Sequence, residues 1–315
     1  MFEFKNEINL VLAADDNYAP PLGVALISII ENYHDSRFLF FHILDNGISD
    51  KNKEYLKIIG KKKGVELIFY DIPENLLADC PEVNHLSRTS YARLMISELL
   101  PSDVDKALYL DADIVVLENI AELYDQDLNG LSLGAVADVM AKEILRIYFY
   151  SGLSNYFNAG VLLINLDSWR RQDVKKKSLE FISRHFKDII RADQDILNCL
   201  FKDDWKLLDN RFNTDLKRRG RKAMPGRGTV VLHYSDRVKP WQYLFSGASG
   251  RYYFDYLRKT PWPDFKFGDK NFKNFFKKYY LLLVKEFKKF LLPYLPTSLS
   301  DNYRRLLWRT YRMKK

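Results

Sequence analysis

Two carboxylates separated by one small residue form the first candidate for chemistry in this sequence. Asp111, Ala112 and Asp113 directly follow the apolar run ALYL. In an extended segment, side chains two residues apart point to the same side, so both carboxylates can reach one cation. Mg²⁺ and Mn²⁺ prefer such oxygen ligands, and a metal here would take up the negative charge of a diphosphate leaving group. Taken alone, the motif is more often a surface Asp pair at a strand end than a metal site.

A histidine and a lysine in the C-terminal part of the sequence could complete such a site. His233 follows the apolar run TVVL, and its neutral imidazole could serve as a third metal ligand. Lys239 follows shortly after and could hold a phosphate as a point charge. A lone histidine at a strand end is more often structural, so this pair gains weight only together with the acidic motif.

Three further clusters place polar side chains after apolar runs or beside small residues. Residues 15–18 (DDNY) follow the run INLVLAA, and their acidic and amide groups suit a base and a ribose better than a phosphate. Residues 193–195 (DQD) open a short predicted helix, and residues 157–160 (FNAG) would let the backbone approach a ligand closely. Helix capping explains the first two clusters equally well. The sequence has no glycine-rich dinucleotide or P-loop motif, which disfavours those two classes of site.

Apolar runs with the length of buried strands alternate with helical patterns, which predicts an α/β fold with a mostly parallel sheet. We expect strands at 8–14, 38–44, 65–72, 106–116, 131–138, 157–166 and 230–234. We expect a first helix that Pro20 and Pro21 open and that residues from 23 onward continue, and a second from Ser49, its N-cap, to residue 59. Further helices are expected at 89–100, 167–186 and 193–201. Such sheets bind ligands beyond the carboxyl ends of their strands, where most of the polar clusters lie.

The composition is that of a folded protein with a basic C-terminal end. Its 315 residues, 47% hydrophobic and 29% charged, exclude a disordered chain, a disulfide miniprotein and a collagen-like repeat. Residues 265–315 carry 14 Lys and Arg against 3 Asp and Glu, a net charge of +11, which leaves −3 of the chain's +8 for residues 1–264. Cys80 and Cys199 form no paired motif, and no secretory signal or membrane-spanning run is recognisable, so we expect a cytoplasmic protein.

Five motifs, taken together and in this order, resemble one family. They are AADDNYA at 13–19, YLDADIVV at 109–116, YFNAGVLLINLDSWRR at 156–171, DQDILN at 193–198 and HYSDRVKPW at 233–241. These segments are similar to those of the retaining family 8 glycosyltransferases, above all the bacterial lipopolysaccharide galactosyl- and glucosyltransferases. Glycogenin and the galactinol synthases are more distant relatives. The likeness extends from about residue 8 to about residue 241 and is close to collinear.

The resemblance implies a single nucleotide-sugar-binding domain of the GT-A type, a Rossmann-like and mostly parallel sheet, over residues 1–264. It implies transfer of a hexose, galactose or glucose, from a UDP-sugar to a saccharide acceptor, with Mn²⁺, or Mg²⁺ in its place, as the metal. The implied metal ligands are Asp111, Asp113 and His233. The residues implied to bind the donor are Ala14, Asp15, Asn17, Tyr18, Arg93, Asp111, Ala112, Asn158 and Lys239. Those implied at the reacting sugar are Gln194 beside the anomeric carbon, Asp195 on the sugar hydroxyls, and Asp138.

Gln194 favours one of two routes to retention. A neutral amide is a poor nucleophile but a tolerable neighbour for an oxocarbenium-like centre, which favours front-face attack by the acceptor. A double displacement would need a well-placed carboxylate, and Asp195 is the weak candidate for it.

Two segments depart from the family pattern. Ser235 and Asp236 stand where the relatives usually carry a glycine near the diphosphate, and a carboxylate there would repel UDP unless Arg237 pairs with it. The basic segment 213–228 does not resemble its counterpart in the relatives, and its cations suit an anionic acceptor such as a phosphorylated lipid-linked glycan.

The C-terminal tail, residues 265–315, has the pattern of a membrane-associating helix. From Phe272 to Leu292 apolar residues recur at helical spacing, lysines lie on the other side, and Pro293 ends the segment. A basic amphipathic helix rich in Phe and Tyr is typical of an interfacial anchor, and anionic lipid would attract its lysines. We therefore expect a peripheral protein on the inner face of the cell membrane, close to a lipid-linked acceptor. A helix docked on the protein body is the alternative.

Three other functions have some support. A phosphatase of the haloacid dehalogenase type also uses a strand followed by Asp-x-Asp, with the first Asp as nucleophile, but it would leave His233 and the 15–18 cluster unexplained. A nucleic-acid binder rests on the basic pI and the aromatics, which the acidic body and the helical tail pattern oppose, so we expect no nucleic acid. A family 8 enzyme could also glycosylate protein or itself.

Overall fold

The computed structural model describes residues 6–73, 80, 88–141, 145, 153, 155–216, 222–262, 268–276, 278–280 and 283. The chain divides into two compact units. The first comprises Met1–Trp241 and Phe245–Phe265, and the second comprises Gln242–Leu244 and Lys266–Lys315.

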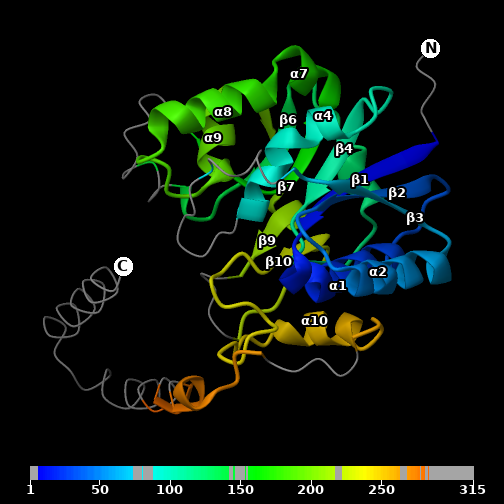
Figure 1. Cartoon of the computed structure of the whole chain (residues 1–315), viewed down its shortest axis with the longest axis vertical. Helices are drawn as coiled ribbons and strands as arrows, with labels where there is room; N and C mark the ends of the chain where they lie inside the picture. Colours follow the sequence, from blue (N-terminus) through cyan, green and yellow to red (C-terminus); the bar gives the residue numbers. More distant parts are fainter. Residues whose placement is uncertain are drawn as a thin grey trace, which may run out of the picture. The chain divides into compact units, whose positions relative to one another are not determined.

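The first unit is built on a seven-stranded sheet with the order β3-β2-β1-β4-β7-β6-β8 (Figure 1). Strand β7 is antiparallel to β4 and β6, and the other neighbouring strands are parallel, so the predicted mostly parallel α/β sheet is confirmed. The strands are β1 (Glu7–Ala14), β2 (Phe38–Asp45), β3 (Glu66–Asp71), β4 (Lys106–Leu110), β6 (Leu133–Ala137), β7 (Phe157–Asn165) and β8 (Trp205–Leu207).

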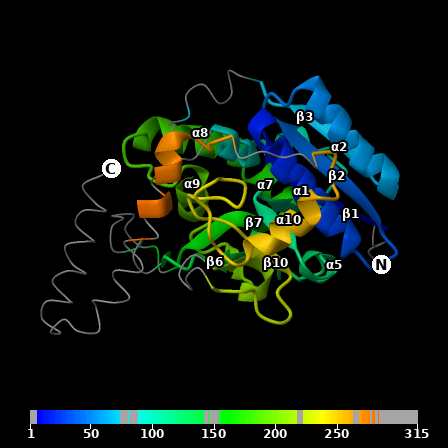
Figure 2. The same cartoon turned by 90° about the horizontal axis from the view of Figure 1, so that it is seen from below.

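Helices cover both faces of this sheet (Figures 1 and 2). On one face lie α1 (Ala19–Glu31) and α2 (Asp50–Lys63), and on the other η2 (Arg88–Met95), α4 (Ile96–Leu99), α7 (Leu166–Arg171), α8 (Val174–His185) and α9 (Asp193–Leu200). The alternation of β1 explains this layering: Leu10 and Leu12 join the apolar cluster of α1, whereas Val11 and Ala13 join the cluster on the opposite face. Shorter helices are η1 (Asp16–Tyr18), α5 (Ala121–Tyr124), η3 (Asn210–Asn213) and α10 (Gly250–Leu257).

A small three-stranded sheet lies beyond the carboxyl end of β4. Its order is β5-β10-β9, with β5 (Ile114–Val116), β9 (Thr214–Asp215) and β10 (Val231–His233). Strand β10 is antiparallel to β5, and His233 pairs with Ile114. This pairing brings the late part of the chain against the end of β4.

The structure confirms several sequence predictions and corrects others. Pro20 and Pro21 open α1, and the Ser49 side chain caps α2 by accepting from the Asn52 N–H. The predicted strand 106–116 is wrong as a single strand, because a turn at 111–113 separates β4 from β5. The predicted helix 89–100 is mostly a 3-10 helix. The predicted helix 167–186 is broken at Asp173, whose φ of 50° is incompatible with a continuous α-helix.

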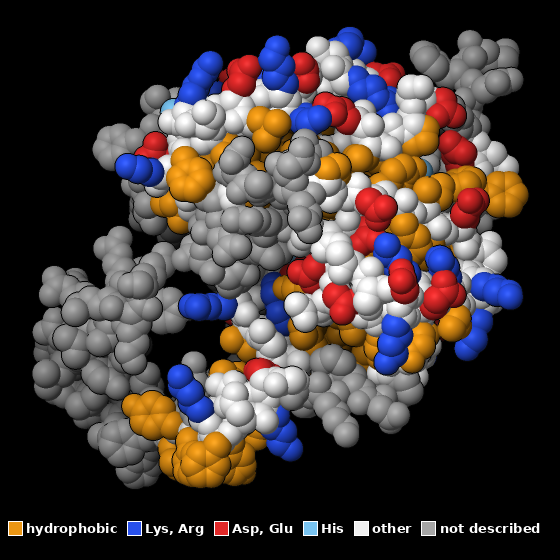
Figure 3. Space-filling view, in the orientation of Figure 1, with side chains coloured by type: hydrophobic (Ala, Val, Ile, Leu, Met, Phe, Trp, Pro, Cys, Tyr) orange, Lys and Arg blue, Asp and Glu red, His pale blue; other side chains and the backbone are white. Residues whose placement is uncertain are grey.

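The second unit contains the start of the tail. Residues 272–276, 278–280 and 283 are helical, and the rest of the predicted helix to Leu292 lies outside the described residues. Large apolar side chains of this segment are exposed, and Figure 3 shows them gathered together with lysines nearby: Phe272, Phe275, Phe276, Tyr279, Tyr280 and Leu283. Among the described residues, no helix combines the length and the apolar character needed to cross a bilayer.

Candidate active site

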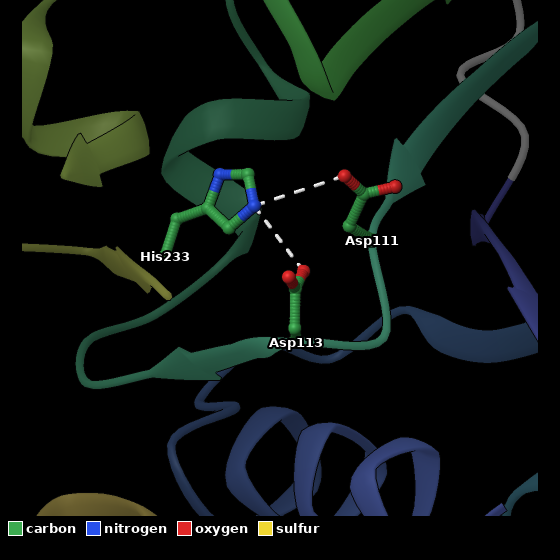
Figure 4. Close-up of side chains that lie close together, drawn as sticks. All are labelled: Asp111, Asp113 and His233. Carbon is green, nitrogen blue, oxygen red and sulfur yellow. Dashed lines mark ion pairs between the residues drawn. The ribbon is translucent and has the colours of Figure 1, made fainter. Parts of the chain in front are cut away.

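Three potential metal ligands converge where β4 ends and β10 lies alongside. Asp111, Asp113 and His233 each offer one ligand atom, and these atoms all lie within 4.8 Å of one another (Figure 4). His233 Nε2 is 3.2 Å from Asp113 Oδ1 and 3.7 Å from Asp111 Oδ2. Asp113 and His233 are buried, and Asp111 is partly exposed. The structure therefore brings these three side chains together, and their role as metal ligands stays a prediction.

The backbone around the turn explains how the two carboxylates come to face the same point. Because residues 111–113 form a turn, the argument from an extended strand is wrong, although the convergence that it predicted is present. The Asp111 N–H donates to the Gly160 carbonyl at 2.8 Å, and the Tyr234 N–H donates to the Asp113 carbonyl at 3.0 Å. Strands β7 and β10 thus hold the two ends of the turn.

Buried cations stand beside both carboxylates. Lys239 Nζ lies 2.5 Å from Asp113 Oδ2, and Arg93 Nη2 lies 2.8 Å from Asp111 Oδ1. Burial raises the pKa of Asp113, but the charges of Lys239 and His233 outweigh it and hold that pKa well below its ordinary value. Burial lowers the pKa of His233, yet Asp113 and Asp111 more than compensate and raise it. Lys239, Arg93 and His233 thus offset the negative charge of the two carboxylates.

The donor set of this pocket fits a hard divalent cation. Two carboxylate oxygens and one imidazole nitrogen are ligands that suit Mn²⁺ and Mg²⁺. Three side chains leave further coordination positions for ligand oxygens or water. The position of Lys239 against Asp113 shows that the pocket can hold positive charge, and the residues present therefore fit the metal that the sequence predicted.

A second group of predicted residues lies around the amide of Gln194. Its Nε2 donates to Asp138 Oδ2 at 3.1 Å, and its Oε1 accepts from the Ala159 N–H at 3.0 Å. Arg191 Nη1 also approaches Asp138 Oδ2 at 3.4 Å. The amide is thus fixed between β7 and the end of β6, with its oxygen and nitrogen assigned by a backbone donor on one side and a carboxylate on the other.

Asp195 is held by its own surroundings. The side chain is fully buried, and its Oδ1 accepts from the Tyr156 hydroxyl at 2.5 Å. Its Oδ2 accepts from the backbone N–H groups of Ile190 at 2.9 Å and Arg191 at 2.8 Å. These contacts are those of a residue that holds the segment leading into α9 in place. The contact with sugar hydroxyls that the resemblance implies stays a prediction.

The loop after β1 lies close to the acidic turn. Strand β1 pairs in parallel with β4, Leu12 with Leu110, so buried Ala14 comes level with the start of the turn. Asp15 Oδ1 accepts from the Tyr18 N–H at 3.0 Å, which is the capping role, while exposed Asn17 is open to a ligand. Burial, followed by the charges of Asp113, Asp15 and Asp111, raises the pKa of Tyr18 far above its ordinary value. The predicted nucleotide-binding loop and the predicted metal site therefore share one edge of the sheet.

The comparison with family models decides which family carries this site. Residues 9–244 match the model described as glycosyl transferase family 8. This chain belongs to glycosyl transferase family 8. The family implies a nucleotide-sugar donor and a saccharide acceptor, and the predicted membership is confirmed.

Individual relatives of this family 8 enzyme cover most of its length. It is 30% identical to general stress protein A of Bacillus subtilis over 82% of the chain and 96% of that protein. It is 29% identical to a lipopolysaccharide 1,2-glucosyltransferase of Escherichia coli K12, over 88% of the chain and 86% of that protein. A crystal structure of the galactosyltransferase LgtC with donor and acceptor sugar analogs superposes with a TM-score of 0.71 at 34% identity, over 81% of this chain and 96% of that one. The predicted fold of the GT-A type is thereby confirmed.

Three further residues support the site of this family 8 enzyme, and none of them was given a role of its own from the sequence. Asp193 is buried against Arg93, with its Oδ2 at 2.8 Å from Nε, and burial raises its pKa to about 6 although Arg93 opposes the shift. Asn213 Oδ1 accepts from His233 Nδ1 at 2.9 Å. A Cβ on Gly160 would overlap with His233 and lie 2.6 Å from Asp111 Oδ2. Asp193 and Gly160 stood inside quoted motifs, whereas Asn213 gave no sequence signal.

The segment after His233 departs from the family, as the sequence indicated. Asp236 is exposed, and its Oδ1 accepts from the backbone N–H of Arg237 at 2.7 Å. This contact is made by the Arg237 backbone, and it is not the pairing with the guanidinium that would offset the charge of Asp236. Ser235 instead donates to Asp215 in β9. The departures at 217–221 lie outside the described residues.

Proposed function

We propose that this family 8 enzyme transfers a hexose, galactose or glucose, from a UDP-sugar to a saccharide acceptor with retention at the anomeric carbon. The observation that carries the proposal is the cluster of Asp111, Asp113 and His233, whose ligand atoms lie within 4.8 Å of one another, next to the loop after β1. Mn²⁺ held there would neutralise the charge that develops on the diphosphate as the sugar leaves.

The side chains of this chain divide the remaining work. Asp15, Asn17 and Tyr18, beside Ala14, would bind the uracil and the ribose. Lys239 would turn from Asp113 to the diphosphate, and Ala112 lies between the two carboxylates at that point. Arg93, Asp138 and Asn158 would bind the sugar or its phosphates, with Gln194 beside the anomeric carbon. The proposed roles are consistent with the location of these carboxylate, cationic and amide side chains at one edge of the sheet.

For the chemical step we favour front-face attack. The acceptor hydroxyl oxygen bonds to the anomeric carbon while the bond from that carbon to the diphosphate oxygen breaks, and the hydroxyl proton passes to the leaving phosphate. The contacts of Asp195 support this route, because a carboxylate whose two oxygens accept three hydrogen bonds is poorly placed to attack. A sugar ester trapped on Asp195 and detected by mass spectrometry would overturn it.

The acceptor we propose is a lipid-linked saccharide of the lipopolysaccharide type. The names of two relatives support it, the Escherichia coli 1,2-glucosyltransferase and a Salmonella typhimurium lipopolysaccharide 1,3-galactosyltransferase at 25% identity. The basic segment 213–228 supports an anionic acceptor. Growth of the intact mass with a UDP-sugar alone would instead assign glycosylation of the protein itself.

The experiment that tests the donor and the metal is UDP release from a panel of UDP-sugars, in Mn²⁺ and in EDTA, with a separate titration of UDP in the presence of Mn²⁺. We expect release from one UDP-hexose that EDTA abolishes. If folded protein neither releases UDP from any sugar nor binds UDP with Mn²⁺, the proposed donor class is wrong. Binding without release would show that an acceptor is obligatory.

We also propose that the tail attaches the enzyme to an anionic membrane surface. Six large apolar side chains of 272–283 are exposed at 40% or more, beside Lys273 and Lys278. Burying an apolar side chain of this size in lipid contributes about 1.5–3 kcal/mol, and each lysine near an anionic surface about 1 kcal/mol. These contributions favour an interfacial position over an exposed one.

Removing residues 265–315 is expected to lower binding to vesicles that contain anionic lipid by at least about tenfold, because the apolar and cationic groups are lost together. Sedimentation with anionic and with zwitterionic vesicles measures this. The full-length double variant Phe272→Ser, Phe276→Ser should show a smaller loss in the same direction, and its UDP release should equal that of the wild type. Unchanged vesicle binding after truncation would refute the attachment.

A further inference from the structure

We propose that Asn213 is a positioning residue that holds a proton on His233 Nδ1, so that Nε2 is the ring nitrogen available to a cation beside Asp111 and Asp113. The inference rests on the proposed metal role of these three residues. Asn213 lies in η3, outside every motif of the sequence, and only 5% of it is exposed. A chain of hydrogen bonds connects the Gly160 backbone, through the side-chain amides of Asn158 and Asn213, to the His233 imidazole.

The first step assigns the amide of Asn158. The oxygen and nitrogen of an amide are ordinarily assigned only by their hydrogen-bond partners. The Gly160 backbone N–H donates to Asn158 Oδ1 at 3.0 Å, and a backbone N–H can donate but never accept. The atom that faces Gly160 must therefore be the amide oxygen of Asn158.

The second step assigns the amide of Asn213. Its Nδ2 lies 2.9 Å from the same Asn158 oxygen. Because that atom is an acceptor, Asn213 must present its NH₂ group there, and its own Oδ1 then points the other way. Asn213 Oδ1 lies 2.9 Å from His233 Nδ1. An amide oxygen only accepts, so the proton of this hydrogen bond must reside on Nδ1.

The proton on Nδ1 determines the role of the opposite ring nitrogen of His233, Nε2. Because Asn213 holds a proton on Nδ1, the nitrogen that can give up its proton to a bound cation is Nε2, which lies 3.2 Å from Asp113 Oδ1 and 3.7 Å from Asp111 Oδ2. His233 and Asn213 are both buried, so water competes poorly for Nδ1. Outer partners of this kind orient a ligating histidine, and their loss typically costs about 10- to 100-fold in metal affinity.

Two variants of Asn213 separate this role from mere packing. Asn213→Leu has similar bulk but no acceptor for Nδ1–H. Asn213→Asp keeps an acceptor oxygen there, loses the donor to Asn158 and adds a negative charge, which would itself favour a cation at the site. Asn210→Leu is the matched control, since Asn210 lies exposed in the same 3-10 helix. The tautomer is measured by multiple-bond ¹H–¹⁵N NMR with UDP and diamagnetic Mg²⁺ present, and Mn²⁺ affinity by electron paramagnetic resonance with UDP present.

We expect the Nδ1–H tautomer in the wild type, in Asn210→Leu and in Asn213→Asp, and a mixture of tautomers in Asn213→Leu. Mn²⁺ affinity should fall about 10- to 100-fold in Asn213→Leu and less in Asn213→Asp. An Nε2–H tautomer in the wild type overturns the inference even if Asn213→Leu does not fold. Equal loss of affinity in Asn213→Leu and Asn213→Asp overturns it as well. Wild-type protein that carries the Nδ1–H tautomer but does not bind Mn²⁺ with UDP would refute the proposed metal role and not this assignment.

Discussion

Asp113→Asn is expected to lower metal-dependent UDP release by about 10²- to 10³-fold. The change removes one negative charge from the pocket and replaces a carboxylate oxygen by an amide that binds divalent cations weakly. A metal at a developing charge contributes several kcal/mol to the transition state, and each 1.4 kcal/mol corresponds to a tenfold change in rate. Asp113 also faces Lys239 at 2.5 Å, so the variant leaves a buried ammonium with one partner fewer.

The measurement is steady-state UDP release with Mn²⁺, normalised to folded protein by circular dichroism. Asp103→Asn is the matched control, because Asp103 is exposed just before β4 and undergoes the same isosteric change. The control should keep wild-type turnover. If the folded Asp113→Asn variant retained EDTA-sensitive turnover near the wild-type rate, the metal would bind at another place.

The place of the candidate site was predictable because its residues follow directly after apolar runs. Asp111, Asp113 and His233 each end or follow a buried strand, and strands of an α/β sheet carry their ligands at the carboxyl edge. The local geometry was not predictable in the same way. The run 106–116 is apolar enough for one strand, yet it turns at 111–113 because β5 pairs with β10, a contact made across more than a hundred residues.

The role of Asn213 could not be found from the sequence either, because it too depends on contacts between distant elements. Asn213 has the identity of any turn residue, and its role depends on where η3 lies relative to β10 and β7. The strained Ala192, with φ 51° and ψ −131°, is equally silent in the sequence, although it directly precedes the DQD segment. Patterns of apolar residues predict elements, whereas hydrogen bonds between distant elements are fixed only by tertiary packing.

Gly160→Ala is expected to lower Mn²⁺ affinity in the presence of UDP by about 10- to 100-fold, with a still larger loss of turnover. Gly160 lies in β7, and an added Cβ would overlap with His233 Cε1 and lie 2.6 Å from Asp111 Oδ2. Two of the three proposed ligands would have to move apart or turn away. Displacing well-packed groups in this way costs about 1–3 kcal/mol, which is the stated change in affinity.

The backbone conformation of Gly160 is one that alanine can adopt, so this substitution tests the site and not the stability of the fold. Among the described glycines, those with positive φ are Gly47, Gly64, Gly130 and Gly228, so Gly160 has a conformation that alanine adopts without strain. Gly226→Ala is the matched control, because no atom lies within 4 Å of its added Cβ. Both variants should fold, and only Gly160→Ala should lose Mn²⁺ binding by electron paramagnetic resonance. If Gly160→Ala bound Mn²⁺ and UDP as tightly as Gly226→Ala, the metal would not lie between Asp111 and His233, because that is where the methyl group enters.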